Sequence, residues 1–127
     1  MKGVTGLIVA MSLGVALLLA PAAGAKDGDI RVAGVCSTPA TSKLKLSEED
    51  GGIEVEFEVD QNRNGVRWRV TLSQNGKQIG SRVRVTRAPS GSFEARFVAG
   101  NRAGADRFVA RATSASGAVC TARASFS

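Results

Sequence analysis

The sequence contains no histidine and no tyrosine, and it has only two cysteines. Histidine is the side chain that most often acts as a general acid or base, and a free cysteine is a common nucleophile. Two thiols without histidine also provide too few soft ligands for a zinc site. These absences argue against catalysis and against a bound metal or cofactor. We therefore expect a protein that is not an enzyme.

Long hydrophobic runs are missing from most of the chain, and the one exception is at its N-terminus. An apolar stretch over residues 3–20 follows Lys2 and precedes the small residues Ala23 and Ala25. This order is typical of a secretory signal peptide that is cleaved before Lys26. We predict a signal peptide over residues 1–25 and a single domain over residues 26–127. The expected product is secreted and has no membrane span after cleavage, because no later run is long enough.

The two cysteines, Cys36 and Cys120, allow only one pairing. An even number of cysteines in an exported protein indicates a disulfide. The predicted bond joins the start of the domain to its end. In the chain-entropy model, closing such a long loop stabilises the folded state by about 4–5 kcal/mol.

Acidic residues are outnumbered, with 11 Asp and Glu against 17 Lys and Arg. The predicted signal peptide contains one charged residue, Lys2. Its cleavage therefore lowers the formal net charge by one, from the +6 of the whole chain to +5. A small exported domain with this charge attracts polyanions such as cell-wall polymers, nucleic acid or acidic surfaces. The alternative is that the surplus arginine serves only solubility.

No segment of residues 26–127 has the spacing of an amphipathic helix. Apolar and polar residues alternate instead, which is typical of half-buried strands. Clear alternation covers 53–59, 66–72, 82–85 and 93–97, and weaker strands are expected over 30–36, 42–46, 107–113 and 118–126. Gly, Asn and Ser clusters separate these segments. The pattern predicts an all-β fold, an immunoglobulin-like antiparallel β-sandwich of seven or eight strands.

One hairpin can be placed in register from the sequence. Asn75-Gly76 is a strong signal for a two-residue type I′ turn, with Gln74 opposite Lys77. Continuing that register puts the single tryptophan, Trp68, on the inner face, where the alanines of the last strands leave room for it. On the outer face, the same register places two pairs of arginines directly opposite each other. These pairs are Arg69 with Arg82 and Arg67 with Arg84.

Four clustered guanidinium groups destabilise a sheet unless something offsets them. If the segment 53–59 lies beside 66–72, then Glu56 and Glu58 neutralise the arginines and the cluster is structural. In an immunoglobulin-like sandwich, the neighbour is instead the segment with Arg107 and Arg111, and the patch grows. Such a surface suits carboxylate, sulfate or phosphate groups, which guanidinium binds in a bidentate manner.

The segment Asp60-Gln61-Asn62-Arg63-Asn64-Gly65 matches the front half of a calcium-binding loop. Only one of these residues is a carboxylate, and the position of the bidentate glutamate is taken by Thr71. We therefore interpret the segment as a β-turn and expect no metal site.

Four segments of the chain carry a family resemblance: Glu49-Asp50-Gly51-Gly52, residues 60–68, Ala88-Pro89-Ser90-Gly91-Ser92-Phe93 and Gly104-Ala105-Asp106-Arg107-Phe108. Together they resemble a group of small exported actinobacterial proteins of unassigned function, with an immunoglobulin or fibronectin type III-like sandwich. The resemblance implies the fold but brings no catalytic or binding residues. Neocarzinostatin-like chromoprotein carriers are similar in size and fold, but they have two disulfides and an acidic surface.

We expect a monomeric, secreted, non-enzymatic binding or interaction module of unknown ligand. Its predicted site is the arginine-rich sheet face of Arg67, Arg69, Arg82 and Arg84, contacting an extracellular acidic polymer or an acidic protein. Nucleic acid is not the expected partner, because the aromatic residues fall mostly at inward positions. The alternatives are a small-ligand carrier or an enzyme inhibitor using the loops 60–65 and 100–104, and a structural protein with no ligand.

Overall fold

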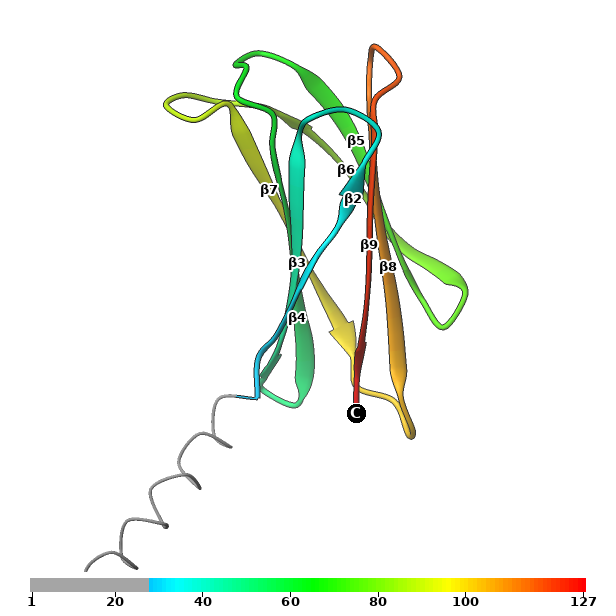
Figure 1. Ribbon diagram of the computed structural model, residues 1–127. Helices are drawn as coiled ribbons and strands as arrows, with labels where there is room; N and C mark the ends of the chain where they lie inside the picture. The colour runs from blue at the N-terminus through cyan, green and yellow to red at the C-terminus, as the bar shows by residue number, and fades with distance from the viewer. Residues whose placement is uncertain (1–27) are drawn as a thin grey trace, which may run out of the picture.

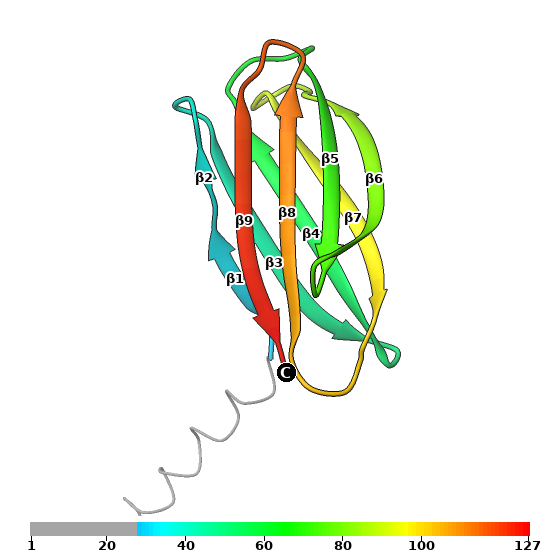
Figure 2. The same ribbon diagram turned by 90° about the vertical axis from the view of Figure 1, so that its right-hand side faces the viewer.

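The computed structural model describes residues 28–127, which form two antiparallel β-sheets packed face to face (Figures 1 and 2). The signal peptide predicted for residues 1–25 lies outside the described residues. The four-stranded sheet has the order β1-β3-β4-β7, and the five-stranded sheet has the order β2-β9-β8-β5-β6. The strands are β1 (Ile30–Ala33), β2 (Val35–Cys36), β3 (Thr41–Glu49), β4 (Gly52–Asp60), β5 (Arg67–Gln74), β6 (Lys77–Val85), β7 (Ser92–Gly100), β8 (Asp106–Ser114) and β9 (Val119–Phe126). The prediction of an all-β sandwich is confirmed.

The chain crosses between the two sheets several times. Three hairpins stay within one sheet: β3 with β4, β5 with β6, and β8 with β9. The connections from β4 to β5, from β6 to β7 and from β7 to β8 pass from one sheet to the other. As a result, β5 lies between β6 and β8, and β4 lies between β3 and β7.

Residues 28–127 form nine strands instead of seven or eight, because the first strand is divided. Residues 30–36 were expected to form one strand, but the chain changes sheets at Gly34. Before it β1 pairs with β3, and after it β2 pairs with β9. A β-carbon at Gly34 would lie 2.2 Å from Oγ of Ser42 and 2.8 Å from the carbonyl oxygen of Thr121. Only glycine fits where the chain passes this closely between the two sheets.

The core lies between the sheets and is built from alternate residues of each strand. Trp68 is 1% exposed, and its indole ring centroid lies 5.9 Å from that of Phe93. The indole N–H donates a 3.1 Å hydrogen bond to Oε1 of Gln61. The predicted role of Trp68 as a core residue is confirmed. The small inward residues predicted on the last two strands are also buried, namely Ala110, Ala112, Ala122 and Ala124.

The turn between β5 and β6 forms where the sequence predicts it. Asn75 and Gly76 both have positive φ angles, of 50° and 85°, as a type I′ turn requires. Gln74 lies opposite Lys77, so the register at the turn is the predicted one.

Candidate functional site

The register predicted for the rest of the β5–β6 hairpin is wrong. The pairing shifts by one residue between Leu72 and Ser73, where Ser73 lies opposite Gln78 but Leu72 lies opposite Gly80. The extra residue, Ile79, is a β-bulge, and beyond it every side chain of β6 is on the other face. The alternation of polar and apolar residues gives no sign of this shift.

A close approach between strands of different sheets accompanies the bulge. A β-carbon at Gly80 would lie 2.8 Å from Cδ2 of Phe97, which belongs to β7 in the other sheet. An isolated glycine within a strand pattern is a signal of a bulge or of a close backbone approach. Gly80 is therefore the residue that could have corrected the predicted register.

The consequence is that the four predicted arginines do not share one face. Arg69 lies opposite Val83, and Arg67 lies opposite Val85. Both arginines are exposed on the outer side, together with Val85, which is 39% exposed. The structure thus brings together two of the four predicted site residues.

The other two, Arg82 and Arg84, lie at the edge of the sandwich next to β7. The guanidinium carbon of Arg82 is 4.6 Å from the ring centroid of Phe97. Nε of Arg84 donates a 3.2 Å hydrogen bond to the carbonyl oxygen of Glu94. Both side chains are half-buried there, where Arg82 packs on an aromatic ring of the other sheet and Arg84 contacts its backbone.

The strand beside β5 is β8, not the glutamate-rich β4. Arg111 lies opposite Thr71, and Thr113 lies opposite Arg69. Of the two alternatives, the one in which Glu56 and Glu58 neutralise the arginines of β5 is wrong, because those glutamates belong to the other sheet. The outer face of β5 is instead extended by Arg107 and Arg111, as the immunoglobulin-like alternative expected.

The register across β5, β8 and β9 places the arginines in a regular row. A level here is an outward-facing position of β8 together with its cross-strand partners. Arg69 lies at the level of Thr113, and Arg123 of β9 lies at the level of Val109. Arg111 of β8 occupies the level between these two. Arg67 is one level further, because its carbonyl oxygen accepts a 3.0 Å hydrogen bond from the backbone N–H of Ala115. We call this row the arginine ladder; in order along the sheet it consists of Arg67, Arg69, Arg111, Arg123 and Arg107.

Arg123 was not among the predicted site residues. The alternation in residues 118–126 puts it on the outer side, but its nearness to Arg111 depends on the pairing of β8 with β9. Pairing between strands was the part of the fold that the sequence left open.

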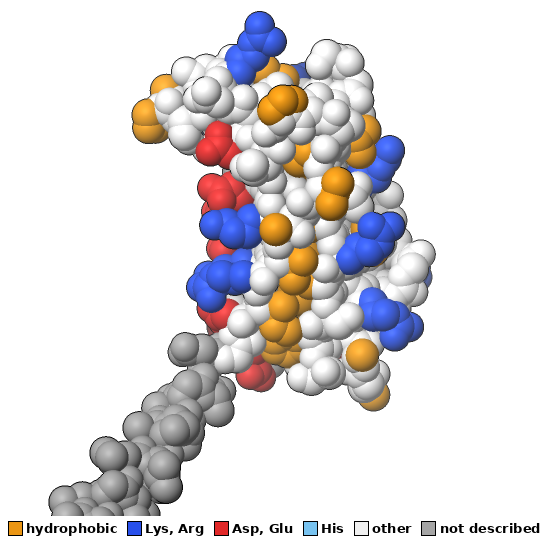
Figure 3. Space-filling model, in the orientation of Figure 1, with side chains coloured by type: hydrophobic (Ala, Val, Ile, Leu, Met, Phe, Trp, Pro, Cys, Tyr) orange, Lys and Arg blue, Asp and Glu red, His pale blue; other side chains and the backbone are white. Residues whose placement is uncertain are grey.

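Charge is divided between the two sheets, as Figure 3 shows from one side. The strands of the five-stranded sheet contain eight cationic residues and one acidic residue, Asp106, which is fully buried. The strands of the four-stranded sheet contain seven acidic and four cationic residues. Among residues 28–127, the strands of the five-stranded sheet therefore present arginine and no carboxylate on its outer face.

The ion pairs follow the same division. Within residues 28–127, every salt bridge involves a cation of β1, β3 or β7, such as Lys43 with Glu58 at 3.6 Å and Arg96 with Glu49 at 3.3 Å. Arg96 also contacts Glu54, and this hydrogen bond is the main cause that raises the pKa of its guanidinium group. In that same part of the chain, no arginine of the ladder has an acidic partner.

The four-stranded sheet also contains a carboxyl group with a perturbed pKa. Glu94 lies opposite Glu58. Partial burial raises the pKa of Glu94 above its ordinary value of 4.5, and repulsion by Glu56 and Glu58 raises it further. The outer face of this sheet therefore carries a surplus of carboxylates, of which Glu56 and Glu58 pair with lysines of β3, in contrast to the arginine ladder.

Two surface hollows lie at the two ends of the arginine ladder. One, of about 310 Å³, is lined by Arg67, Arg69, Thr113 and other residues of β5, β6 and β8. The other, of about 600 Å³, is lined by Arg107 and Arg123 together with Val32, Gly76, Phe108, Val109, Ala124 and Ser125. Both hollows are lined by guanidinium groups together with apolar and hydroxyl-bearing residues, so the charged groups border a space that a ligand can enter.

The tip of the β5–β6 hairpin holds the end of the ladder at which Arg107 lies. The N–H of Arg107 donates to Oδ1 of Asn75, and the N–H of Asn75 donates to the carbonyl oxygen of Arg107, both at 2.8 Å. Beside them, the buried carboxylate of Asp106 accepts hydrogen bonds from the amide group of Gln74 at 2.8 Å and from the N–H of Arg102 at 3.2 Å. This network holds the backbone that presents Arg107.

The loop 60–65 has the turn geometry that the sequence indicates. Asn62 and Gly65 have positive φ angles, and the N–H of Asn62 donates a 3.1 Å hydrogen bond to Oδ1 of Asp60. The hydroxyl group of Thr86 donates to the carbonyl oxygen of Arg63 at 2.6 Å. In the described chain, no three His, Cys, Asp or Glu residues are grouped in a way that could hold a metal ion.

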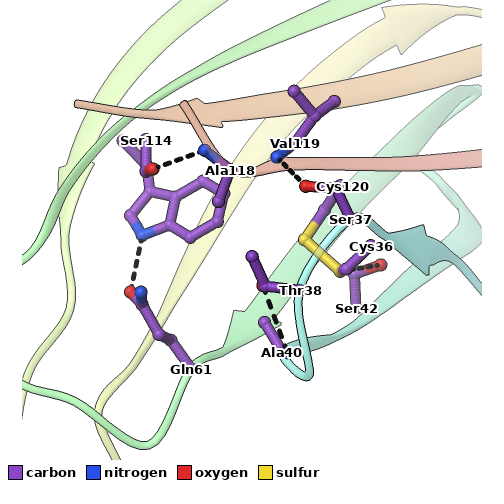
Figure 4. The surroundings of a disulfide bond; sticks show 11 residues. Cys36, Ser37, Thr38, Ala40, Ser42, Gln61, Ser114, Ala118, Val119 and Cys120 are labelled. Atoms are coloured by element: carbon purple, nitrogen blue, oxygen red, sulfur yellow. Dashed lines mark hydrogen bonds between the residues drawn. A yellow bond between two sulfur atoms is a disulfide. The ribbon is translucent and has the colours of Figure 1, made fainter. Parts of the chain in front are cut away.

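The predicted disulfide between Cys36 and Cys120 is confirmed. The two residues are cross-strand partners on β2 and β9, and 84 positions separate them in the sequence. Figure 4 shows the bond beside Ser42 and the hydrogen bond from the N–H of Val119 to the hydroxyl group of Ser37, which is 2.9 Å long. The bond therefore attaches the first strand of the five-stranded sheet to the strand that carries Arg123.

The sequence matches no protein-family model, and a comparison with curated proteins gives no significant match. The residues that the structure describes include no helix that is long and apolar enough to cross a membrane.

Proposed function

We propose that this protein is an exported, non-enzymatic binding module that uses the arginine ladder to hold an acidic polymer outside the cell. The observation that carries the proposal is the row of five arginines on a sheet face to which the strands of residues 28–127 contribute no carboxylate. Neighbouring guanidinium groups repel each other, so an unneutralised row costs stability. A polyanion lying on the row removes that repulsion and forms charge-assisted hydrogen bonds.

Export is supported by the leader pattern and by the disulfide. The Cys36–Cys120 bond persists in oxidising compartments, and thiols in the cytosol are kept reduced. A partner outside the cell membrane is consistent with both features. The net positive charge adds long-range attraction to such a partner and speeds its association at low ionic strength.

We also infer that the sandwich is of the immunoglobulin-like type. The support is the strand order, in which β5, β8 and β9 are neighbours in one sheet and β4 and β7 are neighbours in the other. This corresponds to the C, F and G strands facing the B and E strands of that fold. The tryptophan on β5 takes the position of the buried tryptophan on strand C, although the disulfide here joins terminal strands.

Retention on an immobilised polyanion, dextran sulfate, tests the proposed function. The variant Arg111→Gln/Arg123→Gln removes two charges from the ladder. Arg31→Gln/Arg87→Gln removes two charges elsewhere and serves as the control, since Arg31 belongs to the four-stranded sheet and Arg87 pairs with Ser92 at the start of β7. We expect the ladder variant to bind about tenfold more weakly and to elute at lower salt. Equal elution of the two variants would show that only net charge matters and would contradict the proposal.

A further inference from the structure

The arginine ladder has a regular repeat, which suggests the kind of polymer it binds. Outward-facing residues recur at every second position of a strand, or about 6.7 Å along the sheet. One ladder arginine lies at each of five successive outward levels along β8 and the residue that follows it, those of Ala115, Thr113, Arg111, Val109 and Arg107. The row is therefore about 27 Å long, with one positive charge per level.

The row remains narrow over this length. Arg67 and Arg69 are on β5, Arg111 and Arg107 are on β8, and Arg123 is on β9. These three strands are adjacent, so the row moves sideways by about 10 Å at most. Arginine side chains are long and flexible enough to converge on one extended chain within that width. Figure 2, which looks onto the five-stranded sheet, shows β9, β8 and β5 side by side in the order required.

We propose that the ladder binds a linear phosphodiester polymer of polyol units, lying lengthwise along β8 with one phosphate group per arginine. This inference rests on the proposed function and specifies its ligand. An extended chain gains about 3.3–3.6 Å for every three backbone bonds, as a polypeptide does. A polymer with six backbone bonds per phosphate, such as poly(glycerol phosphate), therefore repeats about every 7 Å. This spacing is close to the step of the ladder.

Guanidinium chemistry fits the phosphate groups of such a chain. The planar donor fork of arginine binds phosphate through two parallel hydrogen bonds. Threonine and serine side chains beside the arginines, including Thr71, Thr113 and Thr121, add hydroxyl donors at the same levels. The two hollows at the ends of the ladder provide space for the polyol units between phosphates.

Single-stranded nucleic acid has a similar backbone repeat, but this face lacks what its bases need. Bases stack on exposed aromatic side chains. Among residues 28–127, Trp68 and four of the phenylalanines are buried, and Phe126 is partly buried against the core. A phosphodiester chain without bases therefore matches the face better than one with bases.

A length series of glycerol phosphate oligomers tests the match. We expect the dissociation constant, measured by calorimetry, to fall steeply as the oligomer grows from two to five phosphates. Beyond five phosphates, the ladder is filled, and affinity should then rise only in proportion to the number of binding positions. An affinity that reaches its limit at two phosphates would overturn the inference. A lower dissociation constant for oligothymidylate than for the glycerol phosphate oligomer with the same number of phosphates would also overturn it and would favour nucleic acid.

Two variants with unchanged net charge test the regular spacing itself. Thr71→Arg/Arg111→Thr moves one arginine to the neighbouring strand but keeps it at its level, since Thr71 lies opposite Arg111. Arg111→Thr/Thr113→Arg leaves the level of residue 111 without an arginine and puts two arginines at the level of Arg69. We expect the first variant to bind the five-phosphate oligomer within about threefold of the wild type. The second should bind at least tenfold more weakly.

The outcome separates the inference from the proposed function. If both variants bind the oligomer with equal affinity and both are retained on dextran sulfate, the ladder is a general polyanion-binding surface. The regular spacing of its arginines then has no role. If the wild type binds neither polymer, the proposed function itself fails. Thermal unfolding of each variant shows whether a loss of binding reflects a loss of the fold.

Discussion

Gly80 and Phe97 lie so close that a β-carbon on Gly80 would be 2.8 Å from Cδ2 of the Phe97 ring. These residues belong to strands of different sheets, at the edge where β6 approaches β7. The contact lies at the bulge that turns Val83 and Val85 outward and takes Arg82 and Arg84 to the sandwich edge. One glycine thus influences which arginines form the candidate binding face.

Substitution of Gly80 tests this contact. We expect Gly80→Ala to lower the free energy of unfolding by about 1–3 kcal/mol, because the added methyl group overpacks the site. Gly100→Ala is the matched control, since a β-carbon there meets nothing within 4 Å. The difference is measured by urea unfolding. If the two variants are equally stable, the close packing of β6 on β7 is not as described.

The hydrogen bond between Gln61 and the indole of Trp68 provides a second prediction. Gln61→Leu leaves a buried N–H group without its acceptor, which costs about 1–3 kcal/mol. Because Trp68 is the single tryptophan, its fluorescence reports directly on this environment during unfolding. Gln78→Leu, at an exposed position of β6, makes the same chemical change as a control. A loss of stability no larger than in the control would contradict the role given to Gln61.

Loss of the disulfide should destabilise the domain strongly. We expect Cys36→Ser/Cys120→Ser to lower the free energy of unfolding by about 2–5 kcal/mol, since the bond closes a loop between residues 84 positions apart. A reducing agent should bring the wild type down to the stability of this variant and leave the variant unchanged. Wild-type protein that keeps its full stability after both thiols have been shown to be reduced would refute the prediction.

The raised pKa of Glu94 predicts a pH-dependent effect of its removal. A carboxyl group whose pKa is higher in the folded state binds its proton more tightly there, so its ionisation lowers stability as the pH rises through the folded-state pKa. We therefore expect Glu94→Gln to be more stable than the wild type at pH 7, with a gain that disappears below about pH 4.

Thermal midpoints of the wild type and Glu94→Gln between pH 3 and pH 8 measure this effect. Glu48→Gln makes the same change at an exposed end of β3, away from Glu56 and Glu58, and serves as the control. If the thermal midpoints of Glu94→Gln and the wild type differ by the same amount at every pH in this range, the charge of Glu94 is not the cause of the difference in stability.

Much of the fold follows from local patterns in the sequence. Alternation identifies the buried residues of β4 and β7, the Asn75-Gly76 pair identifies its turn, and the two cysteines have only one possible pairing. These features depend on residues close together in the chain or on simple counting. The candidate site was predicted only in part, because Arg67 and Arg69 lie on the ladder but Arg82 and Arg84 do not.

The sequence by itself determined which side of β4, β5, β7, β8 and β9 faces the core, since a two-residue period is a local property. It did not do so for β6, whose side chains change faces at the bulge. Tertiary structure alone decided which strands are neighbours and where the period is interrupted. The bulge at Ile79 lies where two sheets approach, and the ladder exists because β8 lies between β5 and β9. Strand pairing depends on contacts between distant residues, so the row that joins Arg69, Arg111 and Arg123 is visible only in the folded protein.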